Sequence, residues 1–386
     1  MSNEVRAVKC STVRGGTSKA VFIMENELPK NAEEREKIIL ALFGSPSLRQ
    51  LDGLGGADIT TSKVAIIGPP TRLDADIDYT FGQVSMDKPF VDFGGNCGNI
   101  SSGVGPYAIY NGLVKIEEPV TTVRIHMTNT GNILTAKVGV QDGRPCVDGD
   151  CEIGGVPGTS SPIEMDWSDV IGSSTGKLMP TGNPKDEIEM DGKIYTVSVV
   201  DSGNIVIFVR ASDFGLKGTE TPDEINGNKE LSDKIEKLRG LICKKIGLTE
   251  SIEEAKSKTP YQPFLALLTE PVDYDTYTHE HVKKEDCDII ARISVMLSVV
   301  KAYPGTATAC TGCAARIKGS LIYDMLSAES REKEVLNIGH PTGTITVNSV
   351  CEYDGESIIP RMKKLSFIRT ARVLMEGTGF IRESVI

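Results

Sequence analysis

Cys97 is the residue whose surroundings are best suited to chemistry. It lies in the glycine-rich segment 94–99 (GGNCGN), directly before the small and apolar residues 100–110, which predict a buried helix. Free N–H groups at a helix start attract an anion, and the same end of the helix dipole favours a thiolate. Cys97 is therefore a candidate acid, base or nucleophile, although a glycine-rich turn around a packed thiol explains the same residues about equally well.

A lysine and a polar turn offer complementary chemistry. Lys63 stands between the glycine-rich loop 53–58 and the apolar residues 64–67, which predict a strand. Burial disfavours the charged form of a lysine, which would make Lys63 a base, but a surface lysine beside a strand is the commoner case. The segment 14–19 (RGGTSK) offers hydroxyl and N–H groups suited to a carboxylate, and here a plain hairpin turn is the commoner case.

The cysteines and histidines predict neither a disulfide scaffold nor a metal centre. The nine cysteines are an odd number and are scattered, which favours reduced thiols. His279-x-His281 and Cys310-x-x-Cys313 lack the spacing of a four-ligand zinc site, so buried thiols and surface histidines are the favoured explanation. The chain also lacks a phosphate-binding loop of the Walker type and a dinucleotide-binding GxGxxG motif.

The elements expected to position these residues form two similar halves. Strand, turn and strand are predicted over 5–23 and again over 196–209, and each half later has a helix start of small residues containing a cysteine. Two charged helices are expected around 222–246 and 284–300. The segment 154–193 is rich in Gly, Pro, Ser and Thr, and a domain boundary fits there. We therefore predict a duplicated α/β unit with a ligand site between the copies.

Length and charge exclude several classes of protein. With 386 residues, two or three domains are expected. Acidic residues outnumber basic ones 53 to 42, giving a formal net charge of −11, so nucleic acid is not an expected partner. The longest apolar stretches, such as 205–209, are far too short to span a membrane, and residues 1–10 lack a signal peptide. The expectation is a cytoplasmic protein without membrane association.

Several motifs together resemble one family. They occur in a fixed order along nearly the whole chain, at 14–19, 56–58 with 61–63, 95–99, 201–204, 301–303, 340–343 and 369–372. This pattern resembles the PrpF family, which includes methylitaconate Δ-isomerase, methylaconitate isomerase and oxalomesaconate tautomerase. The resemblance implies the diaminopimelate epimerase fold, with two pseudo-symmetric α/β domains that each wrap a mixed sheet around a central helix. We expect these domains at 1–186 and 187–367, with the tail 368–386 returning to the first.

The resemblance also implies an activity and a set of site residues. The expected activity is the shift of a C=C double bond in an unsaturated di- or tricarboxylate, with no cofactor or metal, in a chain that can form a homodimer or homotetramer. Lys63 and Cys97 are the implied catalytic pair, in either order of proton transfer. The expected substrate-binding residues are Thr17, Ser18, Asn96, Gly98, Asn99, Asn204 and Thr306.

Two other functions fit parts of the sequence. A cofactor-independent epimerase of the same fold would need one thiol from each half, and Cys97 and Cys310 are candidates. Lys63 argues against that chemistry, which does not need a lysine. A degenerate carboxylate-binding protein is the third alternative. Val300 stands where many family members have histidine, so a different substrate pocket is expected in the second half.

Overall fold

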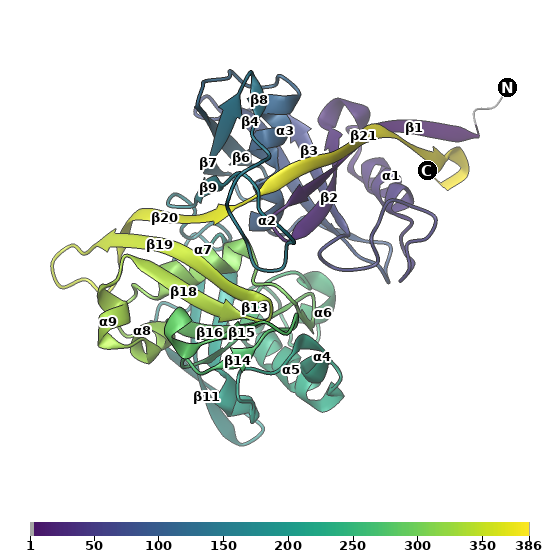
Figure 1. Ribbon diagram of the computed structural model, residues 1–386. Coiled ribbons are helices and arrows are strands. Elements are labelled where there is room, and N and C mark those ends of the chain that lie inside the picture. Colours follow the sequence, from purple (N-terminus) through teal and green to yellow (C-terminus); the bar gives the residue numbers. More distant parts are fainter. Residues whose placement is uncertain (1–3, 386) are drawn as a thin grey trace. The chain divides into compact units, whose positions relative to one another are not determined.

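The computed structural model describes residues 4–385, and the chain divides into two compact units. The division falls after Met165 and again before Arg369, so the first unit contains both ends of the chain and the second is Asp166–Ile368. In Figure 1 the yellow C-terminal strand β21 (Ala371–Arg382) runs beside the purple strand β1 (Val5–Gly15), with which it pairs antiparallel. Among the described residues, no helix has the length and apolar character needed to cross a membrane.

The first unit is built on one mixed sheet. Its main strands follow the order β21–β1–β2–β3–β4–β6–β7, and the pairs β2/β3 and β4/β6 are parallel while the other pairs are antiparallel. The remaining bounds are β2 (Ser18–Met24), β3 (Lys63–Gly68), β4 (Ile77–Val84), β5 (Val91–Asp92), β6 (Val120–Met127), β7 (Asn132–Gln141), β8 (Arg144–Pro145) and β9 (Ile163–Asp166). The sheet therefore places the starts of β2 and β3 side by side, since Ala20 pairs with Lys63.

Capping residues set the ends of helix α1 (Ala32–Phe43) in the first unit. This helix starts at Asn31, whose side chain accepts a hydrogen bond from the Glu34 amide, and ends at Gly44, whose φ of 68° favours glycine. The predicted helix 100–110 is split into α2 (Gly98–Ser101) and α3 (Val104–Tyr110). Short 3-10 turns lie at Glu25–Glu27 and Glu383–Val385.

The split between α2 and α3 has a local cause. The Ser101 hydroxyl donates to the Cys97 carbonyl, and the Ser102 hydroxyl donates to the Asn99 carbonyl. Such bonds compete with the regular helical pattern. Gly103 follows, where an added Cβ would lie 2.9 Å from the Val13 side chain. The two short helices are buried and together form the central helical layer of this unit.

The second unit repeats the same sheet topology. Its strands follow the order β10–β11–β12–β13–β16–β18–β19–β20, and β12/β13 and β16/β18 are the parallel pairs. Their bounds are β10 (Asp186–Met190), β11 (Lys193–Ser202), β12 (Asn204–Arg210), β13 (Phe264–Thr269), β16 (Ile289–Val295), β17 (Ser298–Val299), β18 (Val335–His340), β19 (Gly343–Glu352) and β20 (Arg361–Arg369), with a separate hairpin of β14 (Tyr274–Asp275) and β15 (His281–Val282).

The helices of the second unit surround one buried helix. Helix α7 (Gly305–Ala314) is buried along its whole length and contacts β11, β12 and β19. The other helical segments are η2 (Ala211–Phe214), α4 (Pro222–Asn226), α5 (Lys229–Lys245), α6 (Ala255–Lys258), η3 (Lys284–Asp286), α8 (Leu321–Met325) and α9 (Ala328–Glu332). The expected helix at 222–246 is present as α4 and α5. The expectation of a helix at 284–300 is wrong, because η3 is followed there by strands β16 and β17.

The two units share one design. In each, two antiparallel strands lead to a parallel neighbour, and the sheet packs on a central helical element, α2 with α3 or α7. This confirms the predicted pseudo-symmetric α/β fold. The division lies earlier than the boundary expected at 186, because the segment from Asp166 bonds within the second unit. The Trp167 amide donates to the Leu365 carbonyl at 2.7 Å, and the Asp201 carboxylate accepts from the amides of Ser174 and Thr175.

Candidate active site

Lys63 is a buried lysine at the first position of strand β3. Its side chain lies against the face of Phe81, with the ammonium nitrogen 5.2 Å from the ring centroid, and the residue is only 5% exposed. Its Nζ donates a hydrogen bond of 2.9 Å to Oε1 of Gln83, its partner across the β3/β4 pair. The alternative of a surface lysine beside a strand is therefore wrong, since this side chain points into the protein.

Cys97 is the N-cap of α2 and lies beside Lys63. Its sulfur is 3.7 Å from Nζ of Lys63, although the two residues are 34 positions apart in the sequence. The residue is 6% exposed, and its backbone carbonyl accepts from the Ser101 amide at 2.9 Å. The fold thus brings the predicted catalytic pair into direct contact within the first unit.

The hairpin between β1 and β2 packs on the start of α2. The Thr17 hydroxyl accepts from Nδ2 of Asn99 at 3.0 Å, and the Gly16 amide donates to the Thr370 carbonyl at 2.8 Å. At Gly16, with φ of 49°, an added Cβ would lie 2.3 Å from Oδ1 of Asn99. Any larger residue at this position would therefore displace the Asn99 side chain, which explains the glycine in this turn.

A buried guanidinium completes this group of residues. Nε of Arg369 donates to Oδ1 of Asn99 at 2.9 Å, so the Asn99 side chain links Arg369 to the β1/β2 hairpin. Burial lowers the pKa of Arg369 to about 9, and electrostatic interactions with Cys151 and Cys97 act in the opposite direction. Arg369 is therefore a buried cation that is hydrogen-bonded to Asn99, two residues after Cys97.

Ser18, Gly98 and Asn96 are the other predicted site residues of the first unit, and each has different contacts. Ser18 is 4% exposed and pairs with Gly15 at the turn of the hairpin. Gly98 is the first residue of α2 and is buried. Asn96 is fully buried, and its Nδ2 donates to the Thr130 hydroxyl at 3.1 Å, so this amide supports the loop before Cys97.

The two predicted residues of the second unit contact each other. Nδ2 of Asn204 donates to the hydroxyl of Thr306 at 3.0 Å, and both residues are fully buried. Thr306 lies in the first turn of α7, whose N-cap is Pro304. Pro304 therefore occupies on α7 the position that Cys97 occupies on α2.

Cys310 does not lie at the start of its helix. It is in the second turn of α7, is fully buried, and donates its S–H to the Val200 carbonyl at 3.3 Å. Burial raises the pKa of the Cys310 thiol well above its usual range. The two-cysteine alternative placed this thiol at the second helix start, and the structure does not place it there.

Two glutamines that the sequence analysis did not predict form hydrogen bonds with the segment that precedes Lys63. Nε2 of Gln83 donates to the carbonyls of Ile59 and Ser62, at 3.1 and 2.9 Å. Oε1 of Gln50 accepts from the Ser62 hydroxyl and from the Ala57 amide, at 2.7 and 2.8 Å. The signal for Gln83 is its register opposite Lys63, which only a correct pairing of β3 with β4 would reveal.

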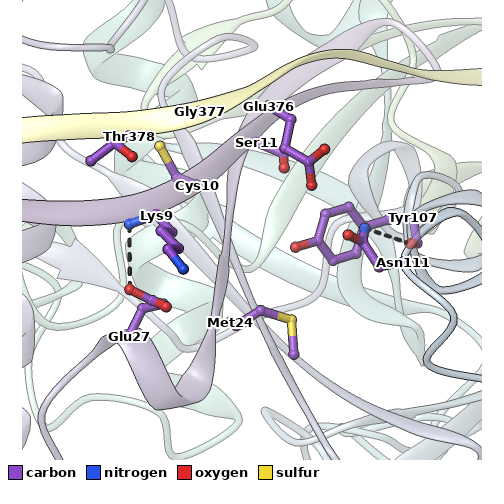
Figure 2. A pocket seen from close by; sticks show the side chains of 10 residues that line it. All are labelled: Lys9, Cys10, Ser11, Met24, Glu27, Tyr107, Asn111, Glu376, Gly377 and Thr378. Atoms are coloured by element: carbon purple, nitrogen blue, oxygen red, sulfur yellow. Dashed lines mark hydrogen bonds between the residues drawn. The ribbon is translucent and has the colours of Figure 1, made fainter.

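A separate pocket of about 440 Å³ lies along β1 and β21 (Figure 2). Its lining contains none of the predicted site residues and consists of Lys9, Cys10, Ser11, Met24, Glu27, Tyr107, Asn111, Glu376, Gly377 and Thr378. Burial raises the pKa of the Tyr107 hydroxyl, and a hydrogen bond with Ser11 partly offsets this. Across residues 4–385, no three His, Cys, Asp or Glu side chains gather in a way that could hold a metal ion.

Comparison with known proteins identifies the relatives of this chain. Over 385 residues it is 48% identical to the 3-methylitaconate isomerase of Eubacterium barkeri, covering 100% of this chain and 99% of that protein. It is 36% identical to the 2-methyl-aconitate isomerase of Shewanella oneidensis, covering 97% and 96%. A crystal structure of methylitaconate-delta-isomerase matches with a TM-score of 0.80 at 46% identity, covering 99% of this chain and 97% of that one.

A more distant structure supports the fold alone. A hydroxyproline epimerase from Agrobacterium vitis matches with a TM-score of 0.57 at 11% identity, covering 98% of this chain and 93% of that one. This confirms the expected epimerase-like fold. The sequence model described as "PrpF protein" matches residues 5–382. The resemblance that the motifs indicated is thereby confirmed, and the chain belongs to the PrpF family.

Proposed function

We propose that this protein is an isomerase that moves a C=C double bond within an unsaturated di- or tricarboxylate, with Lys63 and Cys97 as the acid–base pair. The observation that carries the proposal is the 3.7 Å contact between Nζ of Lys63 and Sγ of Cys97, both buried in the first unit. Two groups that can each hold a proton are what a 1,3-hydrogen shift requires. One removes a proton next to a carboxylate and the alkene, and the other returns a proton at the far carbon.

The intermediate of such a shift is a dienolate whose negative charge spreads onto a carboxylate. Fixed donors aimed at a developing charge are often the largest catalytic contribution. Arg369 supplies a buried cation near Cys97, and the Ser18 hydroxyl and the β1/β2 turn supply further donors. These groups favour an anionic substrate in a protein whose net charge is −11. Thr17, Asn96, Gly98 and Asn99 are proposed to shape this anion site. Asn204 and Thr306 of the second unit stay predicted substrate-binding residues.

The relatives suggest the substrate class. One is named a 3-methylitaconate isomerase and another a 2-methyl-aconitate isomerase. Both names describe branched, unsaturated acids with two or three carboxylates. We propose 3-methylitaconate to 2,3-dimethylmaleate, or the interconversion of 2-methylaconitate isomers, as the reactions to test first.

The test is a panel of these acids, incubated with the protein in deuterium oxide and followed by NMR. Movement of the double bond, with deuterium entering the carbon that accepts the returning proton, is the expected result for at least one acid. Aconitate and oxalomesaconate complete the panel, since they differ mainly in substituents. If no acid shows migration while deuterium exchanges at a saturated stereocentre of an added amino acid, the epimerase alternative would replace the isomerase.

Thiol labelling gives a second expected result. Iodoacetamide should modify Cys97, and a dicarboxylate ligand should slow that reaction, while the half-buried thiols Cys146 and Cys351 keep their rates. Cys310 should stay unmodified, because it is fully buried and burial raises its pKa. Peptide mass mapping after timed labelling measures each rate. Equal protection of all cysteines, or none at Cys97, would contradict the placement of the substrate beside Cys97.

A further inference from the structure

Gln83 holds Lys63 by a direct, buried hydrogen bond of normal length. Its Oε1 accepts from Nζ of Lys63 at 2.9 Å, and the glutamine is only 1% exposed. Strand pairing enforces this contact, because Lys63 and Gln83 are opposite each other in β3 and β4. The two side chains therefore stay together as long as the sheet keeps its register.

The orientation of the Gln83 amide is fixed by what surrounds it. Its Nε2 faces the carbonyl oxygens of Ile59 and Ser62, at 3.1 and 2.9 Å, and carbonyls can only accept hydrogen bonds. The amide cannot turn over without setting its own oxygen against both carbonyls. Oε1 therefore always faces Lys63, and the lysine is always the donor in this bond.

A lysine needs such a partner to act at a defined place. Its four-carbon side chain has many rotamers, and a free lysine loses up to about 2 kcal/mol of conformational entropy when it is fixed. In this structure Nζ lies between Oε1 of Gln83 and Sγ of Cys97 and over the ring of Phe81. The amine is thus preorganised beside the thiol before substrate arrives.

The partner's lack of charge matters as much as its position. A carboxylate at the same distance would favour the protonated lysine and so oppose its action as a base. A glutamine accepts the same hydrogen bond without that electrostatic effect. On these grounds we propose that Gln83 is a positioning residue of the isomerase site, which aims Lys63 at Cys97 while leaving the lysine free to release its proton. This inference rests on the proposed function and adds to it a residue outside the catalytic pair.

The test replaces Gln83 in two ways. Gln83→Glu keeps the shape and adds a charge, so the acid limb of the kcat profile should move to higher pH by about one unit or more. Gln83→Met keeps the length and removes the acceptor, so kcat should fall about 10-fold or more with KM nearly unchanged, because the amine loses its fixed position. Gln50→Glu is the matched control. Gln50 belongs to the same buried network but contacts Ser62 and Ala57 rather than Lys63, so this added charge should move the acid limb by less than Gln83→Glu does.

A readout independent of activity separates this inference from the proposed function. In protein carrying ¹³C at the lysine Cε atoms, the signal that disappears in Lys63→Arg belongs to Lys63. Its titration midpoint should rise in Gln83→Glu and rise by less in Gln50→Glu. If that shift occurs in a protein that isomerises no acid of the panel, the positioning role stands and the proposed function fails.

Two results would overturn the positioning role. One is a folded Gln83→Glu variant whose Lys63 midpoint and acid limb do not move, or move equally in Gln50→Glu. The other is a Gln83→Met variant with wild-type kcat. This second result overturns the positioning role even if Gln83→Glu does not fold. A purely structural glutamine would lower thermal stability in these variants without changing any pH dependence.

Discussion

Lys63→Ala is expected to lower kcat by about 100-fold or more, the usual size of a general acid–base contribution. The reason is that Nζ of Lys63 contacts Sγ of Cys97 at 3.7 Å, and the alanine variant leaves Cys97 without its partner in proton transfer. Steady-state kinetics on the best acid of the panel measures the effect. Lys63→Met is the better-matched variant, because it keeps a side chain of similar length and removes the amine, whose nitrogen lies 5.2 Å from the centroid of the Phe81 ring.

Cys310→Ser is the control that separates the isomerase mechanism, which uses Lys63 and Cys97, from the two-thiol epimerase mechanism. This thiol donates to the Val200 carbonyl in the second turn of α7, and a serine hydroxyl can donate there too. Activity should therefore remain close to wild type, with circular dichroism showing that each variant is folded. An inactive Cys310→Ser beside an active Lys63→Met would remove the isomerase assignment and restore the two-thiol mechanism.

The parts of the fold that depend on short-range sequence patterns were predictable from the sequence. The strand, turn and strand over 5–23 and 196–209 are present, and Asn31 and Gly44 bound α1 as their residue types suggest. The duplicated architecture was predictable as well, because the two halves share a pattern and the family motifs extend over both. The contact between Lys63 and Cys97 was expected from the family and could not be computed from spacing, since 34 residues separate them.

Other features depend on partners distant in sequence. Strand β16 is buried at every residue, Arg292 and Ser294 included, and a short, mostly apolar run of this kind is not distinguished from a buried helix by periodicity alone. The segment before 186 looks like a linker by composition, but its hydrogen bonds to Leu365 and Asp201 join it to the second unit. Gln83 belongs to no short motif, and its role follows only from the β3/β4 register.

Gly15→Ala is expected to damage both stability and activity through one contact. A Cβ at Gly15 would lie 2.3 Å from the Asn99 carbonyl oxygen and 3.1 Å from Cα of Ile100, and both are backbone atoms of α2 that cannot rotate away. Either the hairpin or the start of α2 must move, which typically costs about 1–3 kcal/mol for an overpacked core position.

The loss of activity follows from where that movement occurs. Asn99 is two residues after Cys97 and holds both Thr17 and Arg369, so a shift there displaces the thiol from Lys63. Misplacement of about 1 Å can cost on the order of 100-fold in rate, and we expect kcat to fall at least 10-fold. Gly139→Ala is the matched control in strand β7, since its nearest neighbours are 3.4 Å or more away. Urea unfolding and kcat of both variants decide the point: a Gly15→Ala protein as stable and active as Gly139→Ala would mean that the packing of the hairpin on α2 does not position Cys97.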